Sequence, residues 1–125
     1  LVADDGAVVG HILFTPVVVE SAGRRVLGMG LAPMAVLPDR HGQGIGSRLV
    51  SRGLEIVRQR GCPYVVVVGH PEYYPRFGFV PAARLALRSE YDVPDDVFMV
   101  CELHDGALRG ASGTIRYHPM FGDTL

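Results

Sequence analysis

The spacing of apolar and polar residues divides the chain into a strand-rich first part, one amphipathic helix and a second strand-rich part. Residues 8–20 (VVGHILFTPVVVE) and 26–37 (VLGMGLAPMAVL) are rich in β-branched and other apolar side chains, which favour strands. A short strand over residues 1–4 precedes them and a turn signal separates them, so these runs predict a β-meander. Proline has no N–H to donate to a ladder, and we therefore expect an edge position or a bulge at Pro16.

A helical period replaces the strand pattern after residue 44. Apolar side chains recur at helical spacing and form one stripe: Ile45, Leu49, Val50, Leu54 and Val57. Polar side chains lie on the opposite face: Arg48, Arg52, Glu55 and Gln59. Gly61, with Pro63 beyond it, predicts the end of this helix. The apolar run at residues 64–68 (YVVVV) is typical of a strand covered on both faces, as in a parallel sheet. Strand, helix and strand in this order predict a βαβ unit with a right-handed crossover.

The remaining residues predict shorter elements. Residues 72–77 can form a short helix, and residues 97–103 (VFMVCEL) read as another strand. The glycine-rich tail after residue 106 carries one last strand around residues 114–117. The length of 125 residues predicts a single domain over residues 1–125.

The composition excludes several kinds of partner and chemistry. All 12 basic side chains are arginine, and with 13 acidic ones the formal net charge is −1, which offers no global attraction to nucleic acid or a membrane surface. Without lysine there is no Walker A motif, no Schiff base and no lysine nucleophile. The five histidines fall in no metal-ligand spacing, and no apolar run approaches the ~20 residues of a membrane span. Cys62 and Cys101 form no motif, so we expect free thiols in a cytoplasmic protein without a metal.

Three glycines at every second position, Gly42, Gly44 and Gly46, lie between the second strand run and the helix. Glycine lets a ligand approach the backbone closely, and the free N–H groups at a helix start attract an anion. Arg40 and Arg48 are near enough in sequence to add positive charge, so the loop suits a phosphate. The spacing differs from the G-x-G-x-x-G of dinucleotide-binding proteins, and a plain glycine-rich turn is the structural alternative.

The stretch from Met34 to Gly46 resembles motif A of the GNAT superfamily of N-acetyltransferases, which bind acetyl-coenzyme A. That motif reads Gln/Arg-x-x-Gly-x-Gly/Ala at the start of the central helix, so His41 stands in place of the Gln or Arg. The resemblance implies that the pyrophosphate is held by His41, Gly42, Gln43, Gly44, Ile45, Gly46 and Ser47. It also implies that the backbone of Met34, Ala35 and Val36 pairs with the pantetheine arm.

A second segment, residues 70–79 (HPEYYPRFGF), resembles the Tyr-x-x-x-Gly-Phe segment of motif B and the bacterial YhbS-like subgroup of the superfamily. By this resemblance Tyr74 is the general acid that protonates the coenzyme A thiolate, whereas we expect Tyr73 to pack against the sheet. The general base stays open among Glu72, His70, His11 and a water relay.

The resemblance implies a mixed, mostly antiparallel α/β (α+β) sheet with a central βαβ unit, splayed between the strand before the glycine-rich loop and the strand after the helix. Pro33 is a plausible start of that splay. The family begins with a strand and two helices before the meander, and we expect this sequence to begin at the second strand.

The resemblance implies an acetyl-CoA-dependent N-acetyltransferase that acts on an amine of a small molecule or peptide by direct attack in a ternary complex. Acetyl-CoA is then the co-substrate. A non-catalytic acyl-CoA-binding or regulatory module is the alternative, and an interaction domain whose loop is only a turn is a third. A homodimer through an exposed strand or the C-terminal tail is left open.

Overall fold

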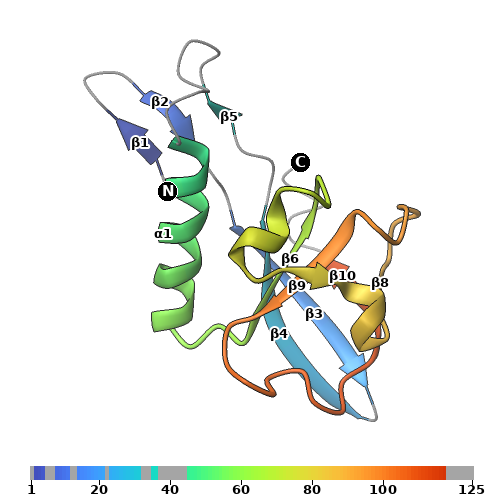
Figure 1. Ribbon diagram of the computed structural model, residues 1–125. Helices are drawn as coiled ribbons and strands as arrows, with labels where there is room; N and C mark the ends of the chain where they lie inside the picture. Colours follow the sequence, from blue (N-terminus) through green and yellow to red (C-terminus); the bar gives the residue numbers. More distant parts are fainter. Residues whose placement is uncertain are drawn as a thin grey trace.

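The computed structural model describes residues 2–4, 8–11, 14–21, 23–31, 35–36 and 45–117, and the fold is that of these residues (Figure 1). The strands are β1 (Val2–Asp4), β2 (Val8–His11), β3 (Phe14–Ser21), β4 (Arg24–Leu31), β5 (Ala35–Val36), β6 (Tyr64–Val68), β7 (Val80–Pro81), β8 (Leu87–Ser89), β9 (Phe98–Glu102) and β10 (Gly113–Tyr117). The helices are α1 (Ile45–Gln59) and two short 3-10 helices, η2 (Tyr74–Phe77) and η3 (Ala82–Leu85).

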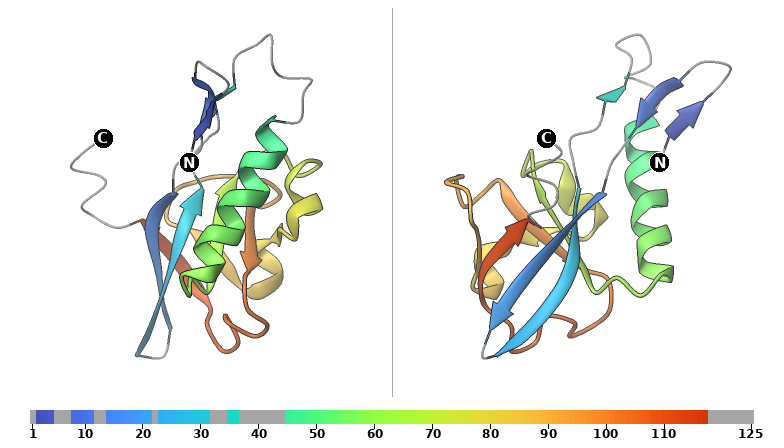
Figure 2. Two further views of the ribbon diagram at one scale, coloured as in Figure 1. Left: turned by 90° about the vertical axis from the view of Figure 1, so that its left-hand side faces the viewer. Right: turned by 180° about the vertical axis from the view of Figure 1, so that it is seen from behind.

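A seven-stranded mixed sheet, in the order β7-β9-β6-β4-β3-β10-β8, forms the body of the molecule, and β1-β2-β5 form a three-stranded sheet. The pairs β4–β6 and β8–β10 are parallel, whereas the other described pairs are antiparallel. α1 lies along one face of the seven-stranded sheet, and the small sheet lies near its N-terminal end (Figures 1 and 2). The predicted mixed, mostly antiparallel fold with a central strand–helix–strand unit is confirmed.

Each of the two long runs of the meander forms two strands rather than one. The run 8–20 becomes β2 and β3, and the run 26–37 becomes β4 and β5. The outer halves, β2 and β5, pair with each other in the small sheet, whereas β3 and β4 form a long hairpin in the large one. Pro16 lies inside β3 opposite Met29, one residue beyond the described β3–β10 register. β3 is an interior strand of the sheet, but at Pro16 it has a described partner on one side only, so no described ladder bond requires the N–H that proline lacks.

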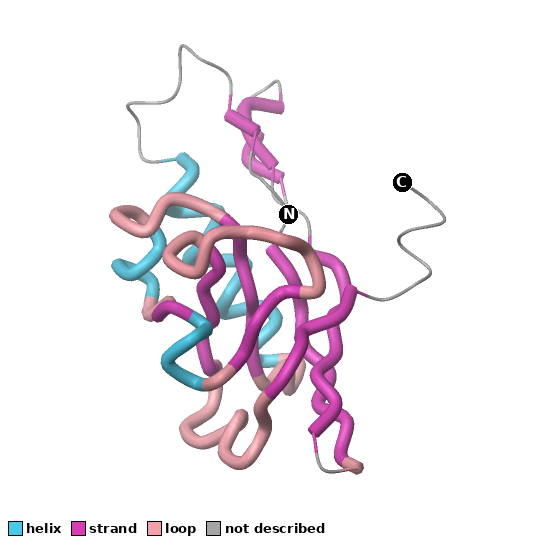
Figure 3. The backbone as a smooth tube through the Cα atoms, turned by 90° about the vertical axis from the view of Figure 1, so that its right-hand side faces the viewer, coloured by secondary structure: helices cyan, strands magenta, loops and turns pink. Residues whose placement is uncertain are grey.

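The core has two parts that meet at β6, because successive side chains of a strand point to opposite faces. On the α1 side, Val65 and Val67 are buried with the helix stripe Leu49, Val50 and Leu54. On the other side, Tyr64 and Val66 are buried in a cluster to which β3, β9, β10 and the 103–112 segment contribute. Figure 3 shows the sheet from the side opposite α1, with the loops in front of it.

β6 is covered on both faces, and its sheet is mixed as expected, because β9 pairs with it antiparallel and β4 parallel. Two other sequence-based expectations need correction. The short helix expected over 72–77 is a 3-10 helix that begins at Tyr74. β7 and β8 were not predicted, because strands this short depend on the pairing that β9 and β10 offer them rather than on a local pattern.

A tyrosine ring packed on a glycine joins β4 to β6. Tyr64 is fully buried, and its hydroxyl donates a 2.8 Å hydrogen bond to the carbonyl oxygen of Val26. A Cβ atom on Gly28 would lie 2.6 Å from Cζ of this ring, so only glycine fits there. Burial also raises the pKa of Tyr64 strongly, which keeps the hydrogen-bonding proton in place.

We expect Gly28→Ala to lower the free energy of unfolding by about 1–3 kcal/mol, because the Tyr64 ring must shift within a packed core. The matched control is Leu27→Ala, at a neighbouring residue that is 60% exposed, where we expect a loss of about 0.5 kcal/mol. Urea unfolding of both variants measures the difference. Equal losses would contradict the packing of Tyr64 on Gly28.

Candidate functional site

The two parallel strands β4 and β6 separate at one defined point. Their pairing runs from Met29–Val65 to Leu31–Val67. Beyond it, β5 pairs with β2, while β6 continues along β9 alone, with Val68 opposite Phe98. Val68 is 44% exposed although the rest of β6 is buried. Beyond Val67, the edge of β6 that faced β4 therefore has no described strand beside it, and the predicted splay begins here.

Tyr74 lies at this point of separation. Its side chain is only 7% exposed and belongs to the same buried cluster as Leu31 and Val67, the last pair of the β4–β6 ladder. The ring makes edge contacts with Phe79 at 5.6 Å and with Tyr73 at 5.0 Å between centroids.

Gly69, the residue after β6, makes room for the Tyr74 ring. A Cβ atom on Gly69 would overlap the ring carbons, and the Gly69 amide donates a 3.0 Å hydrogen bond to the Val97 carbonyl oxygen, so this backbone is held in place. The chain therefore turns back between Gly69 and η2, and the Tyr74 ring packs on the residue that follows β6. Gly78, with φ of +96°, ends η2 in a conformation that favours glycine.

The Tyr74 hydroxyl has a different environment from its ring. It makes no hydrogen bond to another described residue, and no side-chain N or O atom in the described part of the chain is both buried and without a partner. The hydroxyl therefore keeps contact with solvent while the ring is enclosed. Burial, assisted by the neighbouring Tyr73, raises the pKa of Tyr74, so the group stays a neutral phenol at physiological pH.

Tyr73 connects this segment to the first turn of α1. Its hydroxyl lies 2.9 Å from Oγ of Ser47, close enough for a hydrogen bond in which either atom can donate. The Arg76 guanidinium lies over the Tyr73 ring at 4.6 Å, and Arg76 Nε donates to the Tyr73 carbonyl oxygen at 2.9 Å. Tyr73 was expected to pack against the sheet, and it lies partly buried against the apolar cluster that contains Val65 and Val67 of β6. Sequence reasoning missed its contact with Ser47, because no local pattern joins residues 26 positions apart.

The other predicted coenzyme-binding residues fall into two groups. Ala35 and Val36 form β5, opposite His11 and Gly10 of β2, and Ile45 and Gly46 open α1. Met34, His41, Gly42, Gln43 and Gly44 lie outside the described residues, as does Pro33. Among the residues left open as a base, His70 and Glu72 are exposed in the turn before η2.

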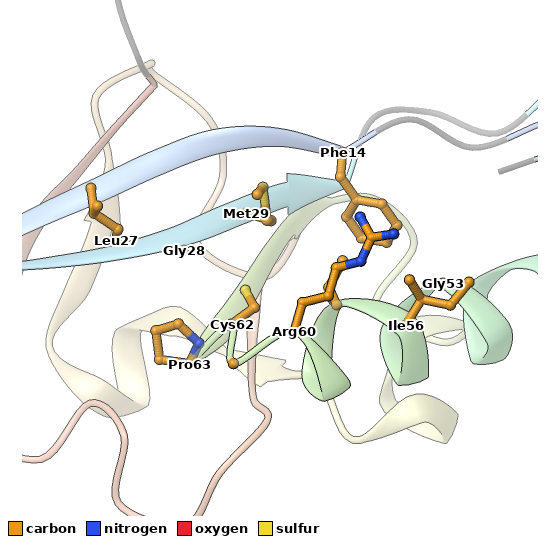
Figure 4. Close-up of a pocket in the computed structure, with 11 residues that line it drawn as sticks. Phe14, Leu27, Gly28, Met29, Gly53, Ile56, Arg60, Cys62 and Pro63 are labelled. Carbon is orange, nitrogen blue, oxygen red and sulfur yellow. The ribbon is translucent and has the colours of Figure 1, made fainter.

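A cavity of about 640 Å³ lies at the other end of α1 (Figure 4). The second half of α1, β4 and the segment leading into β6 form its walls, and Figure 4 shows Phe14, Met29, Ile56, Arg60 and Cys62 around it. Cys62 is half-buried, and its thiol donates to the Tyr64 carbonyl oxygen at 3.2 Å. Burial raises the pKa of Cys62 and disfavours the reactive thiolate. None of the predicted site residues that the structure describes lines this cavity.

No group of three or more His, Cys, Asp or Glu side chains within the described ranges could hold a metal ion. No helix in the same ranges is long and apolar enough to cross a membrane.

Comparison with known proteins points in the same direction as this geometry. The family model for the acetyltransferase (GNAT) domain matches residues 1–81. The N-acetyltransferase YhbS of Escherichia coli K12 is 39% identical over 118 residues, which are 94% of this chain and 70% of YhbS. YjhQ of the same strain, also an N-acetyltransferase, is 42% identical over 93 residues, or 74% of this chain and 51% of YjhQ.

Solved structures give the same assignment. The crystal structure of E. coli YhbS in complex with CoA matches with a TM-score of 0.85 and 37% identity, covering 97% of this chain and 66% of that one. A GNAT family acetyltransferase from Brucella melitensis in complex with acetyl-CoA matches with a TM-score of 0.70 and 33% identity, covering 95% of this chain and 64% of that one. The chain thus spans just under two thirds of both crystallised relatives. From its motifs, its fold and these likenesses, the chain belongs to the GNAT family of acetyltransferases.

Proposed function

We propose that this protein is an acetyl-CoA-dependent N-acetyltransferase that transfers an acetyl group to an amine of a small molecule or peptide by direct attack in a ternary complex. The observation that carries the proposal is the position of Tyr74, a neutral phenol whose hydroxyl has no described hydrogen-bond partner, at the point where β4 and β6 separate.

The described residues fit the coenzyme in two respects. The β6 edge beyond Val67 has no described strand partner, and an extended arm with amide groups can pair with a strand edge of this kind. The start of α1 lies beside the Tyr73–Tyr74 segment, and a helix start suits a pyrophosphate. On this proposal the arm contacts the backbone of Met34, Ala35 and Val36, and residues 41–47 hold the pyrophosphate. Two crystallised relatives, the E. coli and Brucella proteins, hold CoA and acetyl-CoA respectively.

Acetyl transfer from a thioester to an amine requires little from the protein apart from positioning the two substrates. Bound acetyl-CoA supplies an activated thioester, which a neutral amine attacks. Tyr74 holds a proton that it can give to the departing sulfur and then regain from solvent. A phenol is a weaker acid than a thiol of pKa about 8.5, but apolar surroundings such as those that raise the pKa of Tyr74 also disfavour a free thiolate, so proton transfer is feasible as the thiolate leaves.

Calorimetry with acetyl-CoA tests the first half of the proposal. We expect the protein to bind acetyl-CoA and Gly44→Glu to lose binding, because a carboxylate would enter the glycine-rich loop. The matched control is Ser112→Glu, which adds the same charge at an exposed position outside the site and should bind as the wild type does. Absence of binding by a folded wild-type protein would refute the proposal. Binding without thiol release for any amine in a broad panel would favour the non-catalytic acyl-CoA-binding module.

The Tyr74→Phe variant tests whether Tyr74 is the general acid of the reaction. We expect kcat to fall by about 10²-fold with little change in KM for acetyl-CoA, because the ring packing is kept and only the proton is lost. Since burial raises the pKa of Tyr74 above 10.0, the wild type should lose kcat only as pH rises beyond that value, and the variant should lack this alkaline fall. Tyr91→Phe, at a tyrosine that is 59% exposed, is the control. Full turnover of Tyr74→Phe at every pH would remove Tyr74 from the mechanism.

Gly69→Ala tests the position of that phenol. The added methyl group overlaps the Tyr74 ring, so we expect kcat to fall and the free energy of unfolding to drop by about 1–3 kcal/mol. In a Tyr74→Phe background the further loss of kcat should be small, because the hydroxyl that was displaced is already absent. An equal loss of kcat in both backgrounds would show that Gly69 acts independently of the Tyr74 hydroxyl.

A further inference from the structure

The hydrogen bond between Ser47 and Tyr73 joins two parts of the proposed site that are otherwise separate. Ser47 is in the first turn of α1, the end proposed to hold the pyrophosphate, and Tyr73 immediately precedes Tyr74. We propose that Tyr73 is a positioning residue, which through Ser47 couples the binding of the coenzyme's diphosphate to the placement of the Tyr74 phenol. This inference rests on the proposed function.

Tyr73 is held firmly enough to transmit such a constraint. Its ring contacts both the Arg76 guanidinium, at 4.6 Å, and Phe77, whose ring centroid is 5.3 Å away. Arg76 also donates to the Tyr73 carbonyl oxygen, which closes the backbone of this turn. The remaining freedom of the side chain is at its hydroxyl, and there the Ser47 hydroxyl is the partner at 2.9 Å.

The position of the Tyr73 ring in turn limits that of Tyr74. The two rings meet edge to face at 5.0 Å with an interplanar angle of 84°. Tyr74 is bounded on its other sides by Gly69 and Phe79, so it cannot move away from Tyr73 without disturbing the core. A shift of Tyr73 therefore becomes a shift of the Tyr74 phenol.

The choice of donor in the Ser47–Tyr73 hydrogen bond links this pair to the coenzyme's diphosphate. Either hydroxyl can donate, but a single hydrogen bond uses only one of the two protons. An anion at the start of α1 favours the arrangement in which Ser47 turns its proton towards the anion and accepts from Tyr73. Binding of the diphosphate would thus select one orientation of both hydroxyls and fix Tyr73 as the donor.

Comparing two acetyl donors tests the coupling. Acetyl-CoA carries the diphosphate and S-acetylpantetheine lacks it, so only the first can act through Ser47. With the amine that the wild type uses best in a panel of polyamines, amino sugars, amino acids and peptides, we expect Tyr73→Phe to lower kcat for acetyl-CoA about three- to tenfold. The kcat for S-acetylpantetheine should be unchanged.

Matched variants separate coupling from loss of packing. Ser47→Ala should reproduce the effect of Tyr73→Phe, the double variant should lose no more than either single one, and Ser47→Thr should restore kcat because it keeps a hydroxyl. Ser51→Ala, one turn along α1 and exposed, and Tyr91→Phe should both behave as wild type. Equal losses for the two donors, or additive losses in the double variant, would overturn the coupling. A wild type that binds acetyl-CoA but acetylates no amine would refute the proposed function, and this inference with it.

Discussion

The burial of β6 on both faces is the constraint on which the rest of the structure depends. Val65 and Val67 face α1, whereas Tyr64 and Val66 face the second core, so each half of the hydrophobic interior is anchored to the same five-residue strand. Pairing with β4 on one edge and β9 on the other holds it laterally. A strand fixed on four sides gives a rigid starting point to the residues that follow it, and those residues form the proposed site.

The separation of β4 from β6 follows from where the two described ladders of β4 end. β2 and β5 continue the register of the β3–β4 hairpin with a shift of one residue, whereas the described β4–β6 pairing ends at Leu31–Val67. β6 therefore keeps one neighbour at its end while Val68 becomes exposed. The opening is consequently a property of the strand pairing among the described residues.

The same packing arrangement occurs twice, with different consequences for the hydroxyl group. Tyr64 lies on Gly28 and Tyr74 lies on Gly69, each ring filling the space that a Cβ atom would occupy. The Tyr64 hydroxyl is bound to a backbone carbonyl oxygen, so it serves to join strands. The Tyr74 hydroxyl has no described hydrogen-bond partner, so no contact within the described residues occupies its proton. The comparison explains why only one of two buried tyrosines is a candidate acid.

Much of this could be predicted from the residues alone. The apolar stripe of α1, the stop at Gly61 and the bounds of β6 follow from local periodicity and backbone preference, which act within one element. The two motifs, around Gly44–Gly46 and Tyr74–Phe79, indicated the family because each requires particular residues at fixed spacing. The two-residue strand β7 and the three-residue strand β8 carry no such local signal, and their existence depends on partners supplied by β9 and β10.

Only the tertiary structure decided which side chains meet. The contacts of Tyr73 with Ser47, of Tyr74 with Gly69 and of Tyr64 with Gly28 join residues from different elements, and their free energy is gained only when the sheet has formed. Sequence spacing identifies residues that share one face of a helix or strand, because that geometry is local. It carries no distance between elements, and for this reason Tyr73 was expected only to pack, although it also links the start of α1 to the tyrosine at the end of β6.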